Sequence, residues 1–170
     1  MNFEERVIRI LRKNHVFRPP VPVDVIAVQE GIELRQAPTA MNISGALIRS
    51  QDGKVCIALN DAHHSNRQRF TIAHELGHFF LSHSGIGTHV DADFTINLRD
   101  QTSSEATDVN EIQANSFAAE LLMPKSLILK DVCDFLPIDA LAVRKLSRKY
   151  EVSEQAMAIR LTNLGFISPA

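Results

Sequence analysis

One pentapeptide constrains the fold of this chain more than any other stretch. Residues 74–78 read His-Glu-Leu-Gly-His, with two histidines four positions apart. On an α-helix this spacing puts both imidazoles on one face, about 40° apart around the axis and about 6 Å apart along it. Such a pair can share a zinc ion, and the intervening glutamate lies beside the metal, where a general base belongs. The pattern predicts a helix with His74 and His78 as metal ligands and Glu75 as catalytic base; the alternative is a helix that carries two histidines by chance.

The composition is that of an ordinary soluble protein. The chain has 170 residues, of which 45% are hydrophobic and 22% are charged, and its net charge is −2. That length allows a sizeable core, and the charge favours neither nucleic acid nor an anionic membrane as a partner. The first residues begin an amphipathic helix and not an apolar signal segment, and no apolar run is long enough to span a bilayer. Two cysteines, Cys56 and Cys133, make no disulfide framework, so we expect a cytoplasmic protein with reduced thiols.

The first third of the chain predicts two helices followed by a small sheet. Apolar residues recur at helical spacing over residues 3–17, and a second, short helix runs from Asp24 to Gly31. Residues 32–34 are a candidate strand. Residues 46–49 and 54–59 flank Gln-Asp-Gly, which is typical of a β-hairpin. We therefore expect a small antiparallel sheet packed against the helix that carries the two histidines.

The remaining two thirds are predicted to be mainly helical. The histidine helix is expected over residues 67–81, and a second, buried helix over residues 105–123 ends at Pro124. The polar residues 84–104 between them predict a rim or lid over the site, or else a disordered linker. Three short helices follow, at about 125–135, 139–149 and 153–164. The prediction is an α+β fold with a metallopeptidase-like domain over residues 1–124 and a helical subdomain over residues 125–170.

Two histidines do not hold a catalytic zinc ion by themselves, because a third protein ligand is needed. The metzincin extension requires glycine and histidine where this chain has Leu81 and Ser84. His83 falls about 180° from His74 if the helix continues, which points it away from the metal. The other candidates have no supporting spacing or lack the motif of the family that uses them: His63, His64, His89, Cys56 and Cys133.

Glu111 is the best candidate for the third ligand. It is a carboxylate in an otherwise apolar helix, where an unpaired charge is costly unless a cation compensates it. Asn115 lies one turn further on the same face and can accept a hydrogen bond from the free ring nitrogen of a zinc-binding histidine. The alternative is that Glu111 is an exposed first-turn residue that interacts with the helix dipole.

Two sequence blocks resemble a known family. Residues 67–78, Arg-Gln-Arg-Phe-Thr-Ile-Ala-His-Glu-Leu-Gly-His, and residues 111–124, Glu-Ile-Gln-Ala-Asn-Ser-Phe-Ala-Ala-Glu-Leu-Leu-Met-Pro, look like the signature of the ImmA/IrrE-type metallopeptidases. The resemblance covers most of residues 20–124. It implies a zincin-like fold, Zn²⁺ held by His74, His78 and Glu111, and Glu75 as the base. It also implies an endopeptidase that cleaves a partner helix-turn-helix repressor after a stress signal.

A regulator that acts without proteolysis is the competing interpretation. Residues 141–161 resemble a helix-turn-helix in which Ser153 caps the second helix, and the first helix is basic. The second helix offers few groups that read bases, namely Gln155, Arg160 and Asn163. We therefore expect a helical hairpin, with weak nucleic-acid contact as a further possibility for the signal. For the donor that stabilises the oxyanion, the sequence offers Tyr150, His83 and His89 without favouring any of them.

Overall fold

The computed structural model describes residues 3–38, 43–82, 87–92 and 106–168. The chain divides into two compact units. The central unit comprises Val23–Ala118, and the terminal unit comprises Met1–Pro22 together with Ala119–Ala170. The boundary at residue 124 that the sequence suggested stays a prediction.

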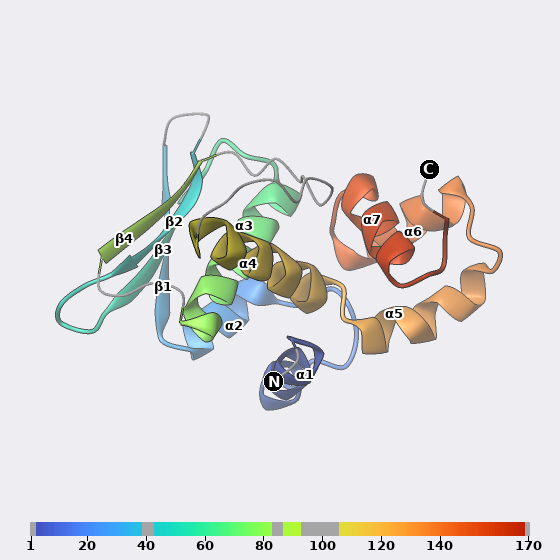
Figure 1. The fold of residues 1–170 in the computed structure, drawn as a ribbon, viewed down its shortest axis with the longest axis horizontal. Helices are drawn as coiled ribbons and strands as arrows, with labels where there is room; N and C mark the ends of the chain where they lie inside the picture. The colour runs from blue at the N-terminus through green and yellow to red at the C-terminus, as the bar shows by residue number, and fades with distance from the viewer. Residues whose placement is uncertain (1–2, 39–42, 83–86, 93–105, 169–170) are drawn as a thin grey trace. The chain divides into compact units, whose positions relative to one another are not determined.

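The central unit is a four-stranded sheet with helices on one side (Figure 1). In chain order it contains α2 (Val23–Gln29), β1 (Ile32–Ala37), β2 (Ile43–Arg49), β3 (Val55–Asn60), α3 (Ser65–Leu81), β4 (Gly87–Ala92) and most of α4 (Ala106–Leu122). The strand order is β1-β3-β2-β4. An α+β fold is thereby confirmed, and the predicted helices and hairpin are present within a few residues of their expected bounds.

One strand pairing differs from the antiparallel sheet that we expected. The predicted hairpin is present, with Arg49 of β2 opposite Val55 of β3, but β1 pairs with β3 in parallel, with Ile32 opposite Val55. The reason is topological. The three strands alternate in direction along the chain, and β1 adds to the free edge of β3 instead of pairing with β2, so it runs in the same direction as β3.

The segment predicted as a lid contains a strand. Residues 87–92 form β4, which pairs with β2 in antiparallel fashion from Arg49 opposite Gly87 to Ile43 opposite Ala92. The disordered-linker alternative is wrong for these six residues, because backbone pairing with an edge strand needs no apolar pattern. A role of this segment as a rim of the site stays a prediction. The rest of the predicted lid, at 84–86 and 93–104, lies outside the described residues.

The core of the central unit lies between the sheet and α3. Leu47 of β2, Ile57 of β3 and Leu76 of α3 are buried almost completely. On the other side of α3, Phe80 contacts the buried Phe117 of α4, with ring centroids 5.8 Å apart. Since α3 is covered by the sheet and by α4, even its polar residues between Thr71 and His78 are buried. Helix α3 therefore carries its polar side chains in the interior of the unit.

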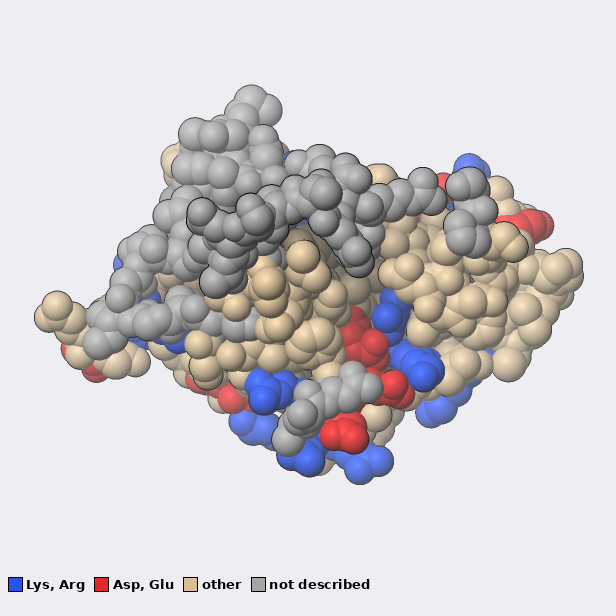
Figure 2. Space-filling model, in the orientation of Figure 1, with Lys and Arg blue, Asp and Glu red and all other residues tan. Residues whose placement is uncertain are grey.

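The terminal unit is helical. It contains α1 (Phe3–Lys13), the end of α4, α5 (Lys125–Asp131), the 3₁₀ turn η1 (Val132–Phe135), α6 (Ala140–Tyr150) and α7 (Glu154–Asn163). Glu120 ties this unit together, since its carboxylate accepts from the backbone amide of Lys125 at 3.0 Å and pairs with the guanidinium of Arg160. Basic and acidic side chains are interspersed on the face drawn in Figure 2. Among the described helices, none has both the length and the hydropathy of a membrane-spanning segment.

Candidate metal centre

Helix α3 carries the two histidines of the pentapeptide. It begins after His64, whose ring nitrogen Nδ1 accepts a hydrogen bond from the amide of Asn66 at 3.2 Å and so caps the helix. It ends at Ser82, which adopts the left-handed conformation with φ 59°. His74 and His78 are 0% and 1% exposed. A long, capped helix between two packed layers fixes the direction of both imidazoles.

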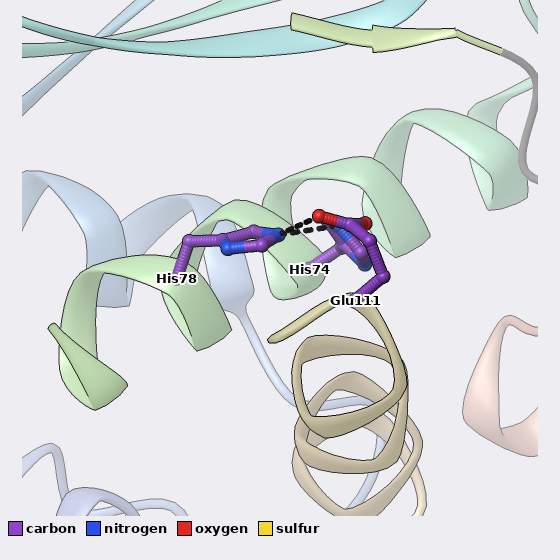
Figure 3. Close-up of side chains that lie close together, drawn as sticks. All are labelled: His74, His78 and Glu111. Carbon is purple, nitrogen blue, oxygen red and sulfur yellow. Dashed lines mark hydrogen bonds and ion pairs between the residues drawn. The ribbon is translucent and has the colours of Figure 1, made fainter. Parts of the chain in front are cut away.

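Three potential ligand atoms converge between α3 and α4 (Figure 3). The Nε2 atoms of His74 and His78 lie 2.9 Å apart. Glu111 of α4 reaches both rings, with Oε2 3.2 Å from Nε2 of His74 and Oε1 3.3 Å from Nε2 of His78. Within the described residues, this is the one group of three such side chains close enough to hold a metal ion together.

The contact with Asn115 favours one tautomer of His74. Its Oδ1 lies 2.9 Å from Nδ1 of His74. An amide oxygen can only accept, so Nδ1 is the donor, and in the neutral ring Nε2 keeps its lone pair. That lone pair faces Nε2 of His78 and the carboxylate of Glu111. A cation among these three atoms would accept the lone pairs of both imidazoles and balance the charge of the carboxylate.

The donor set suits a metal ion. Tetrahedral zinc, with bonds of about 2.0–2.1 Å to nitrogen and oxygen, holds its ligand atoms about 3.3 Å apart. The three separations in the cluster, 2.9, 3.2 and 3.3 Å, are close to that value. Two imidazoles and one carboxylate also leave a fourth position open, as a catalytic site requires. The residues present therefore fit a catalytic metal ion.

Glu75 lies on the side of α3 that faces the sheet. It is completely buried, and its Oε1 lies 3.8 Å from the point where a Cβ on Gly45 of β2 would stand. Its neighbour on the helix, His74, contributes to the ligand cluster. The general base suggested by the sequence is thus adjacent to the cluster along the chain, and strand β2 holds it from the other side.

Comparisons with known proteins identify the family of this chain. The profile of the IrrE N-terminal-like domain family of peptidases matches residues 28–162. The chain belongs to this family. It is also 35% identical over 107 residues to the "Radiation response metalloprotease IrrE" of Deinococcus radiodurans, a match that covers 62% of this chain and 30% of that protein.

A solved structure shares the fold of this member of the IrrE N-terminal-like domain family. The "Mycobacterium tuberculosis transcriptional regulator" superimposes with a TM-score of 0.61 at 18% sequence identity, over 94% of this chain and 46% of the other. At that identity the likeness concerns the fold alone. The chain spans less than half the length of either protein.

A close contact between α3 and α4, which the sequence did not predict, allows the cluster to form. Gly77 lies between the two histidines, and a Cβ there would stand 3.0 Å from Cα and 3.1 Å from the carbonyl oxygen of Ala114. Helices α3 and α4 therefore approach through backbone, one residue before Asn115 and three after Glu111. The signal in the sequence was the pair of small residues, Gly77 and Ala114, but the pairing of the two helices is needed to recognise it.

Glu111 fits the metal-ligand alternative better than the helix-dipole alternative. It lies in the second turn of α4 and its side chain is 33% exposed, so it is not the exposed first-turn residue of the helix-dipole alternative. Its carboxylate contacts both histidines. The premise that it is deeply buried was wrong, because the exposed Val109 and Ile112 show that the first turns of α4 are open on one side.

The other candidate ligands have different surroundings. His64 caps α3, and His63 contacts Asn60 with 3.5 Å between Nε2 and Nδ2. Cys56 is on β3, where burial raises the pKa of its thiol, and the exposed Cys133 donates to the carbonyl of Leu129. His83 and the side chain of His89 lie outside the described residues. Neither thiol joins the metal cluster within the described chain.

Tyr150, a candidate donor to the oxyanion, is engaged within the terminal unit. It is fully buried, and its hydroxyl donates to the carboxylate of Asp131 at 2.8 Å. Burial, followed by this hydrogen bond, raises the pKa of the phenol. The oxyanion donor stays a prediction for all three residues that the sequence offered.

Proposed function

We propose that this chain is a zinc-dependent endopeptidase whose metal ligands are His74, His78 and Glu111 and whose general base is Glu75. The observation that carries the proposal is the convergence of two imidazoles and a carboxylate within 3.3 Å of one another on α3 and α4. Membership of the IrrE N-terminal-like domain family and the likeness to a metalloprotease support a peptidase. Zinc is the metal that two imidazoles and a carboxylate most often hold at a hydrolytic site.

The chemistry follows from the positions of the side chains. When bound, zinc supplies a Lewis acid that acidifies a water molecule and polarises the scissile carbonyl. Glu75 accepts the proton of that water as its oxygen attacks the carbonyl carbon, and passes the proton to the amine when the carbon–nitrogen bond breaks. Asn115 keeps the proton of His74 on Nδ1, which leaves Nε2 free for the metal.

The substrate that we propose is a helix-turn-helix transcriptional repressor, cleaved in response to a stress signal. Support comes from the resemblance of residues 67–78 and 111–124 to the ImmA/IrrE-type peptidases. The name of the Deinococcus radiodurans relative links that protein to the radiation response. A cytoplasmic location is part of the same proposal, because a repressor is found there in a bacterial cell.

The direct test is cleavage of a candidate repressor. The zinc-loaded chain is incubated with a purified helix-turn-helix repressor, chosen from any that is encoded beside it, and fragments are identified by mass spectrometry. We expect one discrete cut. Glu75→Gln should retain zinc and lose the cut, whereas Glu5→Gln, which removes a charge from an exposed position on α1, should keep it. Cleavage by Glu75→Gln at the wild-type rate would overturn the proposed mechanism. Absence of cleavage by the wild type would overturn the proposed substrate.

A nucleic-acid-binding regulator is the second candidate, favoured by the arrangement of α6 and α7. Asp139 and Ser153 cap the two helices, and Glu151 adopts the left-handed conformation between them. Most cations of this hairpin are already paired, however. Arg144 contacts Glu154 at 3.2 Å, Lys149 contacts Asp131 at 2.8 Å, and Arg160 pairs with Glu120. This pairing favours a structural role for the hairpin.

Footprinting with the full chain separates the two candidates. We expect no sequence-specific protection of duplex DNA, and at most weak binding that disappears as salt is raised. Lys145→Ala and Arg148→Ala each remove an exposed cation of α6. If the hairpin has a structural role, both variants should cleave the repressor at the wild-type rate. A specific footprint that these variants abolish would favour the regulator.

A further inference from the structure

Strand β2 contacts the face of α3 that carries Glu75. Arg67, Thr71 and Glu75 are spaced four residues apart, so they lie along one side of the helix. A Cβ on Gly45 would stand 2.3 Å from Cγ2 of Thr71 and 2.9 Å from the carbonyl oxygen of Ala58. Only glycine fits there. The backbone of β2 therefore lies directly against Thr71, one helical turn before the proposed base.

A β-bulge brings a second residue of β2 to the same helix. Ile43 pairs with Ala92 and Gly45 with Asp91, so two steps on β2 correspond to one step on β4, and Ser44 is the extra residue. In a regular strand Ser44 and Gly45 would face opposite sides of the sheet. At a bulge this alternation is broken and a side chain can be redirected. Ser44 is 2% exposed, and its Oγ accepts a hydrogen bond from Nη2 of Arg67 at 2.8 Å.

Arg67 links the Ser44–Gly45 bulge to Thr71, which contacts Gly45. Its guanidinium binds Ser44, and its carbonyl accepts a hydrogen bond from Oγ1 of Thr71 at 3.0 Å. At the other end of the strand, Nη2 of Arg49 donates to the carbonyl of His78 at 3.3 Å. Strand β2 is thus hydrogen-bonded to α3 at two positions along the helix, at Arg67 on the N-terminal side of Glu75 and at His78 on its C-terminal side. The helix can neither shift along the strand nor separate from it without breaking one of these contacts.

We infer that the Ser44–Gly45 bulge, held by Arg67, positions Glu75 for proton transfer. This inference rests on the proposed function, and it assigns a role in that reaction to residues outside the ligand cluster. A base acts only within hydrogen-bonding reach of the proton that it takes, and a displacement of 1 Å can cost about 100-fold in rate. Metal binding, in contrast, depends on α3 and α4. Loosening the bulge should therefore reduce turnover while metal content stays unchanged.

Three variants test the positioning role with a peptide that spans the repressor cut. Ser44→Ala, which removes the acceptor for Arg67, should lower kcat about 10-fold and leave KM within twofold. Ser44→Thr keeps the hydroxyl and should recover most of the loss. Ser147→Ala is the matched control, because Ser147 is also 2% exposed and its hydroxyl also makes a hydrogen bond, to the carbonyl of Arg144. It should leave kcat unchanged.

A compensating pair makes the test independent of a general loss of stability. Gly45→Ala should lower kcat about 100-fold or more, because its methyl group collides with Cγ2 of Thr71 and with the carbonyl oxygen of Ala58. Adding Thr71→Ser removes Cγ2 and with it the closer of the two collisions, and it keeps the hydroxyl that binds Arg67, so it should restore part of kcat. Full activity in Gly45→Ala, or no recovery in the double variant while both remain folded and metal-loaded, would overturn the inference.

A structural readout works without any substrate. Crystal structures of the wild type, Ser44→Ala and Gly45→Ala, each loaded with zinc, give the position of the Glu75 carboxylate relative to His74. We expect it to shift in both variants while the ligand cluster stays in place. An unmoved carboxylate would overturn the inference whatever the activity, whereas an inactive wild type with a shifted carboxylate in the variants would overturn the proposed function alone.

Discussion

Replacing Gly77 by alanine tests the contact on which the metal cluster depends. The new Cβ would stand 3.0 Å from Cα, 3.1 Å from the carbonyl oxygen and 3.4 Å from Cβ of Ala114. Carbon atoms in comfortable contact are about 3.5–4.0 Å apart. Two of the three neighbours are backbone atoms, so no side-chain rotation relieves the crowding. Helix α4 has to move away from α3 by about 0.5 Å or more at this point.

That displacement acts directly on the hydrogen bond between Asn115 and His74. The bond is 2.9 Å long, and Asn115 is the residue after Ala114. Lengthening it by about 0.5 Å takes it beyond the usual range for a hydrogen bond between nitrogen and oxygen. Loss of such a partner typically weakens metal binding by about 10- to 100-fold. Glu111, which is on the same helix, moves away from both imidazoles at the same time.

The effect on folding should be smaller than the effect on metal binding. Alanine is better than glycine in a helix by up to about 1 kcal/mol. Overpacking a filled contact costs about 1–3 kcal/mol. The two terms oppose each other, so the metal-free variant should lose at most about 2 kcal/mol of unfolding free energy.

Two measurements decide the outcome. Zinc affinity is obtained by competition with a chromophoric chelator, and stability by urea unfolding of the metal-free chain. Gly53→Ala is the matched control, because Gly53 has φ +83° and a Cβ added there would meet nothing within 4 Å, so alanine strains the hairpin without a collision. We expect Gly53→Ala to lose stability and keep its zinc affinity. Wild-type affinity in Gly77→Ala would refute the argument.

The remaining predictions concern three other side chains. Glu111→Gln keeps the shape but removes the charge of the third ligand, and should weaken zinc binding more than Asn115→Ala does. Equilibrium dialysis measures the zinc affinity of both variants, and unchanged affinity in Glu111→Gln would mean that another residue is the third ligand. Asn115→Ala should weaken binding by about 10- to 100-fold. For Tyr150, burial and the bond to Asp131 raise the pKa of the phenol, so the folded state keeps a proton that the unfolded chain loses near pH 10. Stability should therefore fall as pH rises above about 10, and less steeply in Tyr150→Phe; equal slopes in urea unfolding between pH 8 and 11 would contradict this assignment.

Local sequence patterns predicted the parts of the structure that depend on neighbouring residues. The His-Glu-x-x-His spacing placed His74 and His78 on one face of α3, and the periodicity of residues 105–123 predicted α4. The Gln-Asp-Gly turn predicted the hairpin of β2 and β3. Glu111 and Asn115 could be proposed together because helical spacing puts them on the same face.

What the sequence did not predict depends on contacts between segments far apart in the chain. The parallel pairing of β1 follows from which edge of the hairpin it joins, and β4 forms because β2 has a free edge for its backbone. Neither event leaves a strong side-chain pattern. The glycines are a similar case. Gly45 and Gly77 look like weak points in a strand and a helix until their neighbours, Thr71 and Ala114, are known.

These two glycines explain how one buried helix can serve both halves of the proposed reaction. Gly77 lets α4 approach α3 from one side, which brings Glu111 and Asn115 to the histidines. Gly45 lets β2 approach from the other side, against Thr71 and close to Glu75. The metal ligands thus depend on one contact and the base on another. Gly77→Ala should therefore reduce zinc affinity first, whereas Gly45→Ala should reduce turnover with zinc retained; if both variants lost the same property, the two contacts would not act separately.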